Sequence, residues 1–419
     1  MSSLAVDLDP GLPELAAAFD LPLVSRWFVE RWPGLGRVVN VTARRVHDTK
    51  YEPSVRCVIA YDLLVERAGE DPQKTIGVAE IGPAGTRLRL YDQDPRMPWL
   101  QEATAPQPMS ERFARLPEFE RAASGPPRIT ALRYKAGVRC ALRYDLPVGD
   151  SSARVFGKML VADGARIMST LDELHELSRA EPEMPRIARP LVYWSDIHVL
   201  AQYAVVDGRE LHEVVFDLGE DPEVRLSWIR TAGARLAGLH AHARTPGPHQ
   251  GLLGDAAELD GYAGAIGRAD AALADAFADA IELLRHTGER EPDAVASHGA
   301  FRTDQFMIQD GRLVMIDLDS YCWADPARDI GNLFAYLRWK SIRQPQHADF
   351  IASARGSFLE GYGEVRDPPS ERWSALYEAA SMLKVAGRRY RSLTVREWPV
   401  VPRLIYDARA LARGRPAPY

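Results

Sequence analysis

The sequence predicts an α+β protein in which two small β-rich segments precede a largely helical one. The first observation is an internal repeat whose copies alternate branched or aromatic residues with polar ones, as strands with one buried face do. The second is a change of apolar spacing to three or four residues beyond residue 160, which is typical of amphipathic helices. The third is the length of 419 residues, which favours two or three domains of about 150 residues each.

The composition excludes several classes of protein. Hydrophobic and charged contents of 46% and 26% are those of a soluble globular chain, and a formal charge of −6 argues against a dedicated nucleic-acid binder. No apolar run approaches the ~20 residues that span a bilayer, and MSSLAVDLDP carries acids where a signal peptide needs lysine or arginine. The three cysteines stand in no metal-ligand spacing and suit a reducing compartment. We therefore expect a cytoplasmic protein without nucleic-acid or membrane partners.

The repeat relates residues 44–65 to residues 127–148 at a constant offset of 83. Each copy contains a Pro- or Gly-bearing turn, so each predicts a β-hairpin, and a further strand follows at 75–79 and at 153–160. The proline-rich stretch 101–127 is interpreted as the join between the two sheets. The identical pairs include Tyr51/Tyr134, Val55/Val138, Arg56/Arg139, Cys57/Cys140, Tyr61/Tyr144, Asp62/Asp145 and Leu63/Leu146. We interpret the paired cysteines as small core residues.

Helical spacing dominates the remainder of the chain. Apolar residues recur at helical intervals over 164–180, 222–243 and 255–287, and the pattern of 325–415 is mostly helical. Strands are expected at 191–194 and 199–206, and a tight hairpin is expected around Asp310-Gly311 within 306–316. We place domain boundaries near residues 110 and 206, which gives segments 1–110, 111–206 and 207–419.

The segment with the clearest chemistry is 296–333, ASHGAFRTDQFMIQDGRLVMIDLDSYCWADPARDIGNL. It resembles the catalytic segment of the aminoglycoside phosphotransferase and choline kinase families, which share the protein-kinase fold. Three elements stand in that family's order and spacing: His298-Gly299, then 316–319 (IDLD), then 325–329 (DPARD). The resemblance spans roughly 127–375. Maltokinase-like members are also similar, with glutamine at the place of Gln305 and an extra domain ahead of the kinase core.

The resemblance implies a bilobal protein-kinase-like fold. The small β-rich N-lobe would lie in 111–206 and the helical C-lobe in 207–419, while 1–110 would form a cap that repeats the small-lobe sheet. The strand of the first copy that corresponds to the Lys158 strand has no lysine at 76–79, so we expect the cap to be non-catalytic.

The resemblance also implies ATP and Mg²⁺ as cofactors. Asp317 follows an apolar strand and would be a metal ligand, since Mg²⁺ prefers hard oxygen ligands, and Gln305 can supply a second oxygen. The alternative for Asp317 is a turn or helix-capping aspartate. Phosphoryl transfer needs positioning and neutralisation of charge, which these groups would supply.

The nucleotide-binding residues are likewise implied by the resemblance. Lys158 matches the phosphate-binding lysine, with a solvated edge lysine as the alternative, and Glu173, or secondly Glu176, would orient it. The hairpin 134–144 that contains Gly137 would lie over the phosphates. The segment Gln202-Tyr203-Ala204 would form the hinge that holds the adenine.

The family's catalytic aspartate is replaced by Ala300, which can neither accept a proton nor orient a hydroxyl. Asp304 is the nearest replacement in the loop, with Asp319 as another and a turn residue as the default. His298 is included among the candidate catalytic residues, although holding the loop is its favoured role. We interpret Asp329 as a buried brace of the loop.

Three functional hypotheses follow. The first is a kinase that phosphorylates a hydroxyl of a small molecule, such as a sugar, an aminocyclitol or a natural-product intermediate. The second is a nucleotide-binding pseudokinase or scaffold in a biosynthetic complex, and the third is a modifier of Ser or Thr in a peptide. The stretch 384–419 is basic, with only Glu397 and Asp407 as acids, and is either a solvated surface or an anion-binding wall beside the acceptor site.

Overall fold

The computed structural model describes residues 9–32, 38–120, 125–149, 151–160, 162–205, 208–287 and 293–417. The chain forms two compact units. The first contains the residues up to Met168 together with Leu191–Ala204 and Arg391–Leu393, and the second contains Ser169–Pro190, Val205–Tyr390 and the residues from Thr394 onward. The first is rich in strands and the second in helices, so the expected α+β class is confirmed.

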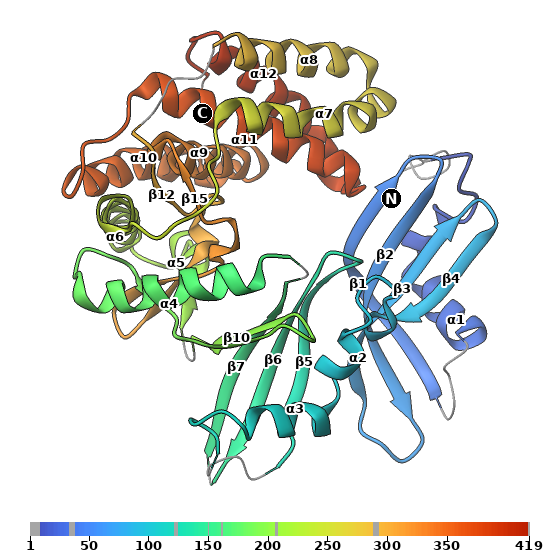
Figure 1. Ribbon diagram of the computed structural model, residues 1–419. Coiled ribbons are helices and arrows are strands. Elements are labelled where there is room, and N and C mark those ends of the chain that lie inside the picture. The colour runs from blue at the N-terminus through green and yellow to red at the C-terminus, as the bar shows by residue number, and fades with distance from the viewer. Residues whose placement is uncertain are drawn as a thin grey trace. The chain divides into compact units, whose positions relative to one another are not determined.

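The first unit holds two antiparallel sheets, each with helices beside it (Figure 1). The first sheet has the order β1-β2-β3-β4 and the second the order β5-β6-β7-β10-β9. The elements of this unit are η1 (Ala17–Phe19), α1 (Leu21–Arg31), β1 (Val38–Glu52), β2 (Arg56–Arg67), β3 (Gln73–Gly82), β4 (Gly85–Leu90), η2 (Tyr91–Gln93), α2 (Leu100–Ala103), α3 (Pro106–Phe113), β5 (Arg128–Lys135), β6 (Arg139–Val148), β7 (Ser151–Met159), β9 (Pro190–Trp194) and β10 (Val199–Tyr203).

The predicted hairpins are confirmed as β1–β2 and β5–β6. The stretch 101–127 joins the two sheets along the chain, as expected, but it also contains α3 and most of α2, which the sequence pattern did not predict. Pro106 stands at the start of α3, where its missing N–H costs no hydrogen bond, and Met109 and Phe113 are fully buried. The strand expected over 199–206 ends at Tyr203, and its last residue, Val206, lies outside the described residues, as do the first eight residues of the chain.

The repeat extends to the helices that precede each sheet. Tyr61 and Tyr144 are both fully buried, and each hydroxyl donates to a helical carbonyl, Ala18 O at 2.7 Å and Ala103 O at 3.0 Å. Both tyrosine rings also meet a helix phenylalanine edge-on: Phe28 and Phe113. Each copy is therefore a complete module, a pair of short helices packed on a hairpin and a third strand.

A second pair of matched segments, 9–15 (DPGLPEL) and 94–100 (DPRMPWL), opens the two modules. Asp94, which is 2% exposed, accepts hydrogen bonds from the Gly137 amide at 2.7 Å and from the Tyr134 hydroxyl at 2.5 Å. Asp9 accepts the equivalent bonds from the Ser54 amide at 2.5 Å and the Tyr51 hydroxyl at 2.8 Å.

The amide donors of these bonds stand at hairpin turns with positive φ, 56° at Ser54 and 65° at Gly137. In each module an aspartate ahead of the helices therefore fixes the turn of the following hairpin. The repeated D-P-x-[LM]-P-x-L pattern, at an offset of 85, is the sequence signal for this contact.

We expect Asp94→Ala to destabilise the first unit more than Asp9→Ala does. Asp94 is the more buried of the two, and its loss leaves the Tyr134 hydroxyl and the Gly137 amide without their acceptor, at a cost of about 1–3 kcal/mol each. Hydrogen exchange at the Gly137 amide and urea denaturation check this. Equal losses of stability in both variants would contradict it.

The two sheets of the first unit are also joined through His47. Its Nδ1 lies 2.6 Å from Asp62 Oδ1, and its Nε2 accepts the Tyr134 amide proton at 2.9 Å. Because a backbone amide can only donate, Nε2 must carry no proton, so Nδ1–H donates to Asp62. The contact therefore requires the neutral ring.

The second unit is helical around two small sheets, of order β11-β13-β14-β8 and β12-β15 (Figure 1). Its helices are α4 (Gly164–Ala180, which begins in the first unit), α5 (Leu211–Val215), α6 (Pro222–His242), α7 (Leu252–Ala269), α8 (Ala271–His286), η3 (Thr303–Gln305), η4 (Leu318–Ser320), α9 (Pro326–Arg343), η5 (Pro345–His347), α10 (Ala348–Gly363), α11 (Glu371–Arg391), η6 (Val395–Val400) and α12 (Val401–Ala412). Its strands are β8 (Arg186–Ile187), β11 (Arg209–Glu210), β12 (Val295–Ser297), β13 (Phe306–Gln309), β14 (Arg312–Met315) and β15 (Cys322–Ala324).

The helices predicted over 164–180 and 222–243 and the hairpin around Asp310-Gly311 are confirmed. The helical region expected over 255–287 is two helices, because the Asp270 side chain accepts from the amides of Ala272 and Leu273 and so begins α8 anew. Within the described residues, none of the helices combines the length and apolar character that crossing a bilayer requires.

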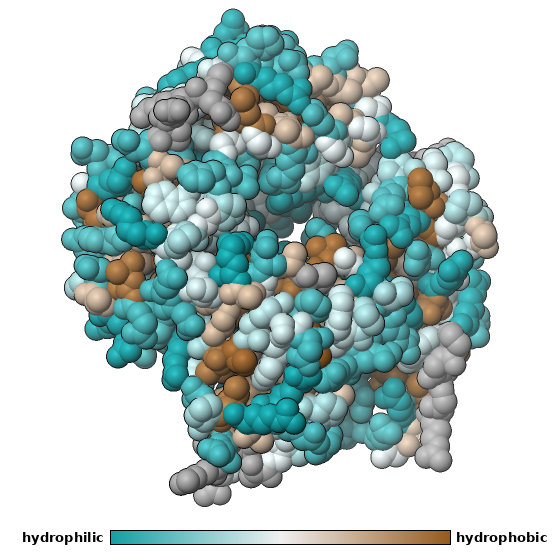
Figure 2. All heavy atoms as spheres, viewed as in Figure 1, coloured by the Kyte–Doolittle hydropathy of each residue, from teal (hydrophilic) through white to brown (hydrophobic). Residues whose placement is uncertain are grey.

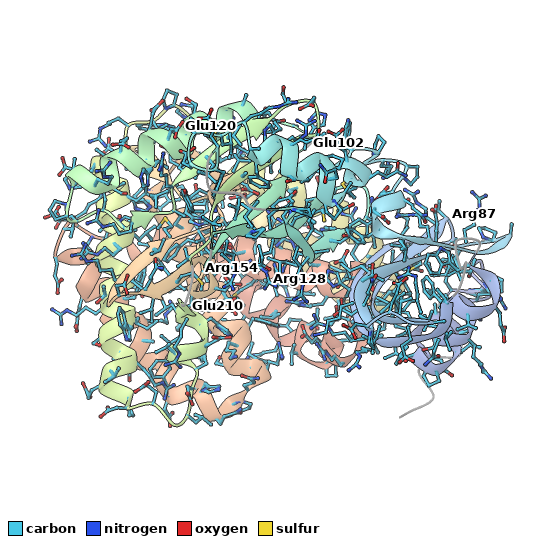
Figure 3. All side chains as sticks on the ribbon, turned by 90° about the horizontal axis from the view of Figure 1, so that it is seen from below. Arg87, Glu102, Glu120, Arg128, Arg154 and Glu210 are labelled. Atoms are coloured by element: carbon cyan, nitrogen blue, oxygen red, sulfur yellow. The ribbon has the colours of Figure 1, made fainter. Side chains whose placement is uncertain are left out.

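The paired cysteines are core residues, as predicted. Cys57 and Cys140 are both 0% exposed, and burial raises the pKa of each thiol to about 12. On the face drawn in Figure 2, hydrophobic residues form small separate patches among polar ones. Charged side chains also pair between neighbouring strands. Arg154 of β7, labelled in Figure 3, donates to Asp145 of β6 at 3.1 Å.

Candidate functional site

The hairpin β13–β14 brings Gln305 and Asp317 together at its open end. The amide of Ile316 donates to the carbonyl of Gln305 at 2.9 Å, and Asp317 is the next residue. Asp317 has a φ of 63°, a left-handed conformation that aspartate tolerates better than most residues. Such a conformation outside glycine is often found where a side chain must be aimed at a ligand.

The loop that follows β12 supports this strand end. The His298 ring is fully buried, and its Nε2 lies 3.0 Å from the carbonyl oxygen of Ile316, so Nε2 carries the proton and donates. Gly299 has a φ of 81°, and a Cβ there would stand 1.9 Å from the Ser320 oxygen. Only glycine fits this position.

The N-terminal turn of α9 holds the same loop through the motif 325–329. Asp329 accepts the backbone amides of His298 and Gly299 at 2.6 and 2.8 Å, which is the bracing role predicted for it. Arg328 donates to the Gly299 carbonyl at 2.8 Å and is itself held by Asp255 through two bonds of 2.8 Å. Both sides of the Gly299 peptide are therefore fixed by one helix.

Asp329 is 0% exposed and lies 3.3 Å from His240 Nε2. Burial raises its pKa, but the hydrogen bond and positive charge of His240, with the charges of His298 and Arg328, outweigh burial and leave the pKa below its ordinary value. His240 lies in the last turn of α6. Its partner stands 89 residues away, so local pattern contained no signal for this pair.

The amide of Gln305 provides a test of metal binding. Its Nε2 donates to Asp304 Oδ1 at 3.1 Å, which fixes the orientation of the amide, and its Oε1 is buried without a hydrogen-bond partner. A buried acceptor without a donor is costly, so its presence indicates a ligand that the oxygen would bind. Oxygen donors from Gln305 and Asp317 fit Mg²⁺, which needs few protein ligands because water and substrate phosphates supply the others.

No cluster of three or more His, Cys, Asp or Glu suited to a metal occurs among the described residues. Asp319, two residues after Asp317, lies in η4.

The predicted substitute base, Asp304, is engaged on both oxygens. Arg302 donates to its Oδ1 and Oδ2 at 2.9 and 3.2 Å, and Gln305 shares Oδ1. Ala300, at the place of the family's aspartate, is partly exposed. Whether Asp304 acts as a base stays a prediction.

Lys158 lies on β7, the middle strand of the second sheet, opposite Ala141 and Leu200. In the first sheet the corresponding position is Glu80, because Val58 faces Glu80 as Ala141 faces Lys158. Glu80 lies 3.6 Å from Arg56. A carboxylate in place of the lysine would repel phosphate, which fits the expectation that the first module is non-catalytic.

The remaining predicted nucleotide-binding residues occupy these places. Glu173 is exposed on α4, and its Oε1 accepts from the Ser169 hydroxyl at 3.5 Å, one turn earlier. The amide of Gly137 is bonded to Asp94. Gln202 and Ala204 lie where the chain passes from the first unit to the second, between Ala204 and Val205.

Several basic side chains of the stretch 384–419 pair with acids of other helices. Lys384 pairs with Glu258 of α7, and Arg409 and Arg413 both pair with Asp279 of α8. The sequence could not show this because the acids come from helices more than a hundred residues earlier. Arg389 is an exception that belongs to a different cluster, described below.

We predict a pH dependence centred on His212 of α5. Its Nδ1 lies 3.2 Å from Thr303 Oγ1 and 3.3 Å from the Tyr336 hydroxyl, and burial, followed by the charge of Lys340, lowers its pKa to about 4. The unfolded ring takes up its proton near pH 6.5, so stability is complete above that value and falls as the pH drops from 6.5 towards 4.

An NMR titration of the His212 ring and denaturation at several pH values check this. We expect no protonation of the folded ring above pH 5. Between pH 6.5 and 4, His212→Gln should lose less stability than the unmodified chain does. A ring that titrates near 6.5 would contradict the prediction.

The geometry defines a class of protein: an α+β protein whose helical unit carries a braced His-Gly loop beside a hairpin-borne carboxylate and amide. Residues 161–373 match the phosphotransferase enzyme family, and the chain belongs to that family. No curated protein sequence matches the chain.

Several solved structures are similar to this one. The choline kinase LicA from Streptococcus pneumoniae is 13% identical, with coverage of 72% of this chain and 98% of that chain and a TM-score of 0.49. The amicoumacin kinase hAmiN, in complex with AMP-PNP, Ca²⁺ and its ligand, is 14% identical, with coverage of 74% and 94% and a TM-score of 0.49. A glucosamine kinase is 16% identical, with coverage of 92% and 96% and a TM-score of 0.40.

Proposed function

We propose that this chain is an ATP- and Mg²⁺-dependent kinase that transfers the γ-phosphoryl group to a hydroxyl of a small molecule. The observation that carries the proposal is the buried, unpartnered Oε1 of Gln305 beside Asp317 in its left-handed conformation. Membership of the phosphotransferase enzyme family supports it. A bound Mg²⁺ would neutralise charge on the nucleotide phosphates.

The nucleotide would be held by the residues that the family resemblance implies. In the proposal, the Lys158 ammonium binds phosphate oxygens and Glu173 orients that lysine. The hairpin turn at Gly137 covers the phosphates, held in position by Asp94. Backbone groups at Gln202 and Ala204 hold the adenine.

In the transfer step, the acceptor oxygen forms a bond to the γ-phosphorus while the bond from that phosphorus to the bridging oxygen of ADP breaks. The hydroxyl proton must also leave. Ala300 cannot accept it, and Asp304 can do so only by giving up part of its contact with Arg302. Because a loose transition state needs modest base assistance, roughly 10²–10⁴-fold, we expect transfer to be slow rather than absent.

The test is calorimetric titration of ATP with and without Mg²⁺, followed by measurement of ADP release with hydroxyl-bearing acceptors. Binding of ATP that requires Mg²⁺, and acceptor-dependent ADP release, would support the proposal. If ATP does not bind at millimolar concentration, the proposal is wrong.

A second candidate, a nucleotide-binding pseudokinase, is favoured by Ala300 together with the engaged carboxylate of Asp304. The variant Ala300→Asp separates the two functions. A kinase should gain at least tenfold in kcat when it regains a base, within the roughly 10²–10⁴-fold range of such groups. A pseudokinase would bind nucleotide and show no turnover in either form.

A further inference from the structure

We propose that the acceptor carries an anionic group, a phosphate or a carboxylate, which binds a cationic cluster beside the transfer loop. This inference rests on the proposed function, because it names the substrate class of the same site. The cationic cluster consists of four basic side chains around three aromatic rings: Arg302, Lys340, Arg343 and Arg389 with Phe216, Tyr336 and Trp339.

Aromatic rings connect the members of the cluster, and the His212 ring joins its two parts, with centroids 4.8 Å from Phe216 and 5.8 Å from Tyr336. The guanidinium carbons of Arg343 and Arg389 lie 5.0 and 4.6 Å from the centroid of the Trp339 ring. The Trp339 ring lies 5.5 Å from that of Tyr336, and Arg302 lies 5.8 Å from the Tyr336 centroid. Lys340 Nζ lies 4.4 Å from the centroid of the Phe216 ring. All these residues belong to the second unit.

Carboxylates compensate only part of this charge. Asp304 pairs with Arg302, and Glu397 lies 2.8 Å from Arg389 and 3.3 Å from Arg343, so that one carboxylate serves two arginines. Lys340 forms no ion pair with any carboxylate of the described residues. Four cations therefore face two acids, and the excess charge is positive.

Lys340 is the decisive member because it is only 8% exposed. A buried cation without a carboxylate partner is among the costliest groups a fold can contain, and such groups persist where they bind a ligand. Burial and the neighbouring charge of Arg343 lower its pKa, which expresses the same cost. The indole Nε1 of Trp339 is a second buried group without a hydrogen-bond partner.

The cluster is open to solvent through its arginines. The side chains of Arg302, Arg343 and Arg389 are 28%, 35% and 27% exposed. Guanidinium groups bind phosphate and carboxylate through paired hydrogen bonds, and the aromatic rings offer apolar contact to the body of the acceptor. A polycationic acceptor would be repelled by the same charges.

The cluster also adjoins the transfer loop. Arg302 lies two residues before Asp304 and three before Gln305, and the negative charge of Asp317 contributes to raising the Arg302 pKa. An anion held here would therefore bring the rest of its molecule next to the proposed metal ligands. The excess positive charge would favour anionic acceptors over neutral ones of the same shape.

The experiment titrates the full-length protein with four probes that share one ring: phenyl phosphate, benzoate, benzyl alcohol and benzylamine. Trp fluorescence and thermal shift report binding, each without nucleotide and again with Mg²⁺ and AMP-PNP. We expect at least one anion to bind tenfold or more tightly than the alcohol and the amine not to bind. Comparison of the affinities for phenyl phosphate and benzoate shows whether the cluster prefers a phosphate or a carboxylate.

Two variants with a matched control make the test specific. Lys340→Met should lower the affinity for the anionic probes at least tenfold. It should also raise the melting temperature of the ligand-free protein, since it removes a buried charge that has no carboxylate partner. Lys384→Met, the same replacement at a lysine paired with Glu258, should leave anion binding unchanged. Arg343→Gln, at a more exposed position, should also lower the affinity for the anionic probes.

The inference is wrong if no anion binds better than benzyl alcohol, or if binding is unchanged in both Lys340→Met and Arg343→Gln. Because anion binding is measured without nucleotide, its outcome is independent of ATP binding. If ATP binds and no anion binds, the inference is wrong and the proposed function stands. If an anion binds and ATP does not, the proposed function is wrong.

Discussion

The variant Asp317→Asn should lose Mg²⁺-dependent nucleotide binding and phosphoryl transfer while keeping its fold. The charged ligand is removed, and a metal ion that neutralises phosphate charge is worth several kcal/mol, so we expect a loss of about 100-fold or more in kcat/KM. Asparagine tolerates the left-handed backbone at this position, where φ is 63°, so stability should change little. Calorimetry with Mg²⁺-ATP and a coupled assay of ADP release measure the two effects.

Asp310→Asn is the matched control. Asp310 lies at the exposed turn of the same hairpin, with a φ of 50°, and undergoes the same chemical change. Its activity should remain within twofold of the unmodified chain. If Asp317→Asn and the unmodified chain bind Mg²⁺-ATP with equal affinity, Asp317 is not a metal ligand.

The second large effect concerns the brace of the transfer loop. Asp329→Ala removes the acceptor of the His298 and Gly299 amides and the partner of His240, all in a fully buried site. Breaking such a buried network should cost about 3–5 kcal/mol. Thermal unfolding and hydrogen exchange at the two amides should show the loss, whereas Asp367→Ala, at an exposed position, should change stability by less than about 0.5 kcal/mol.

The same brace predicts a pH dependence with a definite sign. Because the folded pKa of Asp329 lies below its ordinary value of 3.8, its contribution is complete above that value and is lost as the pH falls through the folded pKa. The difference in stability between the unmodified chain and Asp329→Asn should therefore shrink on acidification below about pH 4. A difference that stays constant or grows on acidification below pH 4 would contradict the prediction, because the folded pKa of Asp329 would then not lie below its ordinary value.

Much of the architecture could be predicted from local pattern. The repeat at an offset of 83 predicted both hairpins, and apolar spacing predicted α4 and α6 almost to the residue. These features depend on neighbours within a few positions, which is the range over which periodicity and turn residues act. The helices α2 and α3 were missed because prolines that begin a helix resemble those of a linker.

The candidate site was predictable only where a contiguous motif carried it. The order of His298-Gly299, Asp317 and Asp329 is visible in the sequence, and so is the replacement at Ala300. The partners of these residues are not visible. His240 meets Asp329 across 89 residues, and Asp94 meets Gly137 across 43.

The sequence by itself determined the order of elements, the duplication and the transfer motif, because each is encoded in residues that are near neighbours or stand at a fixed offset. Only the tertiary structure decided how charge is distributed. It pairs Lys384 with Glu258, leaves Lys340 without a carboxylate among the described residues, and buries Gln305 Oε1 without a donor. The reason is physical: a charge or an amide is costly or stable according to its burial and its partners, and both are set by packing between distant segments.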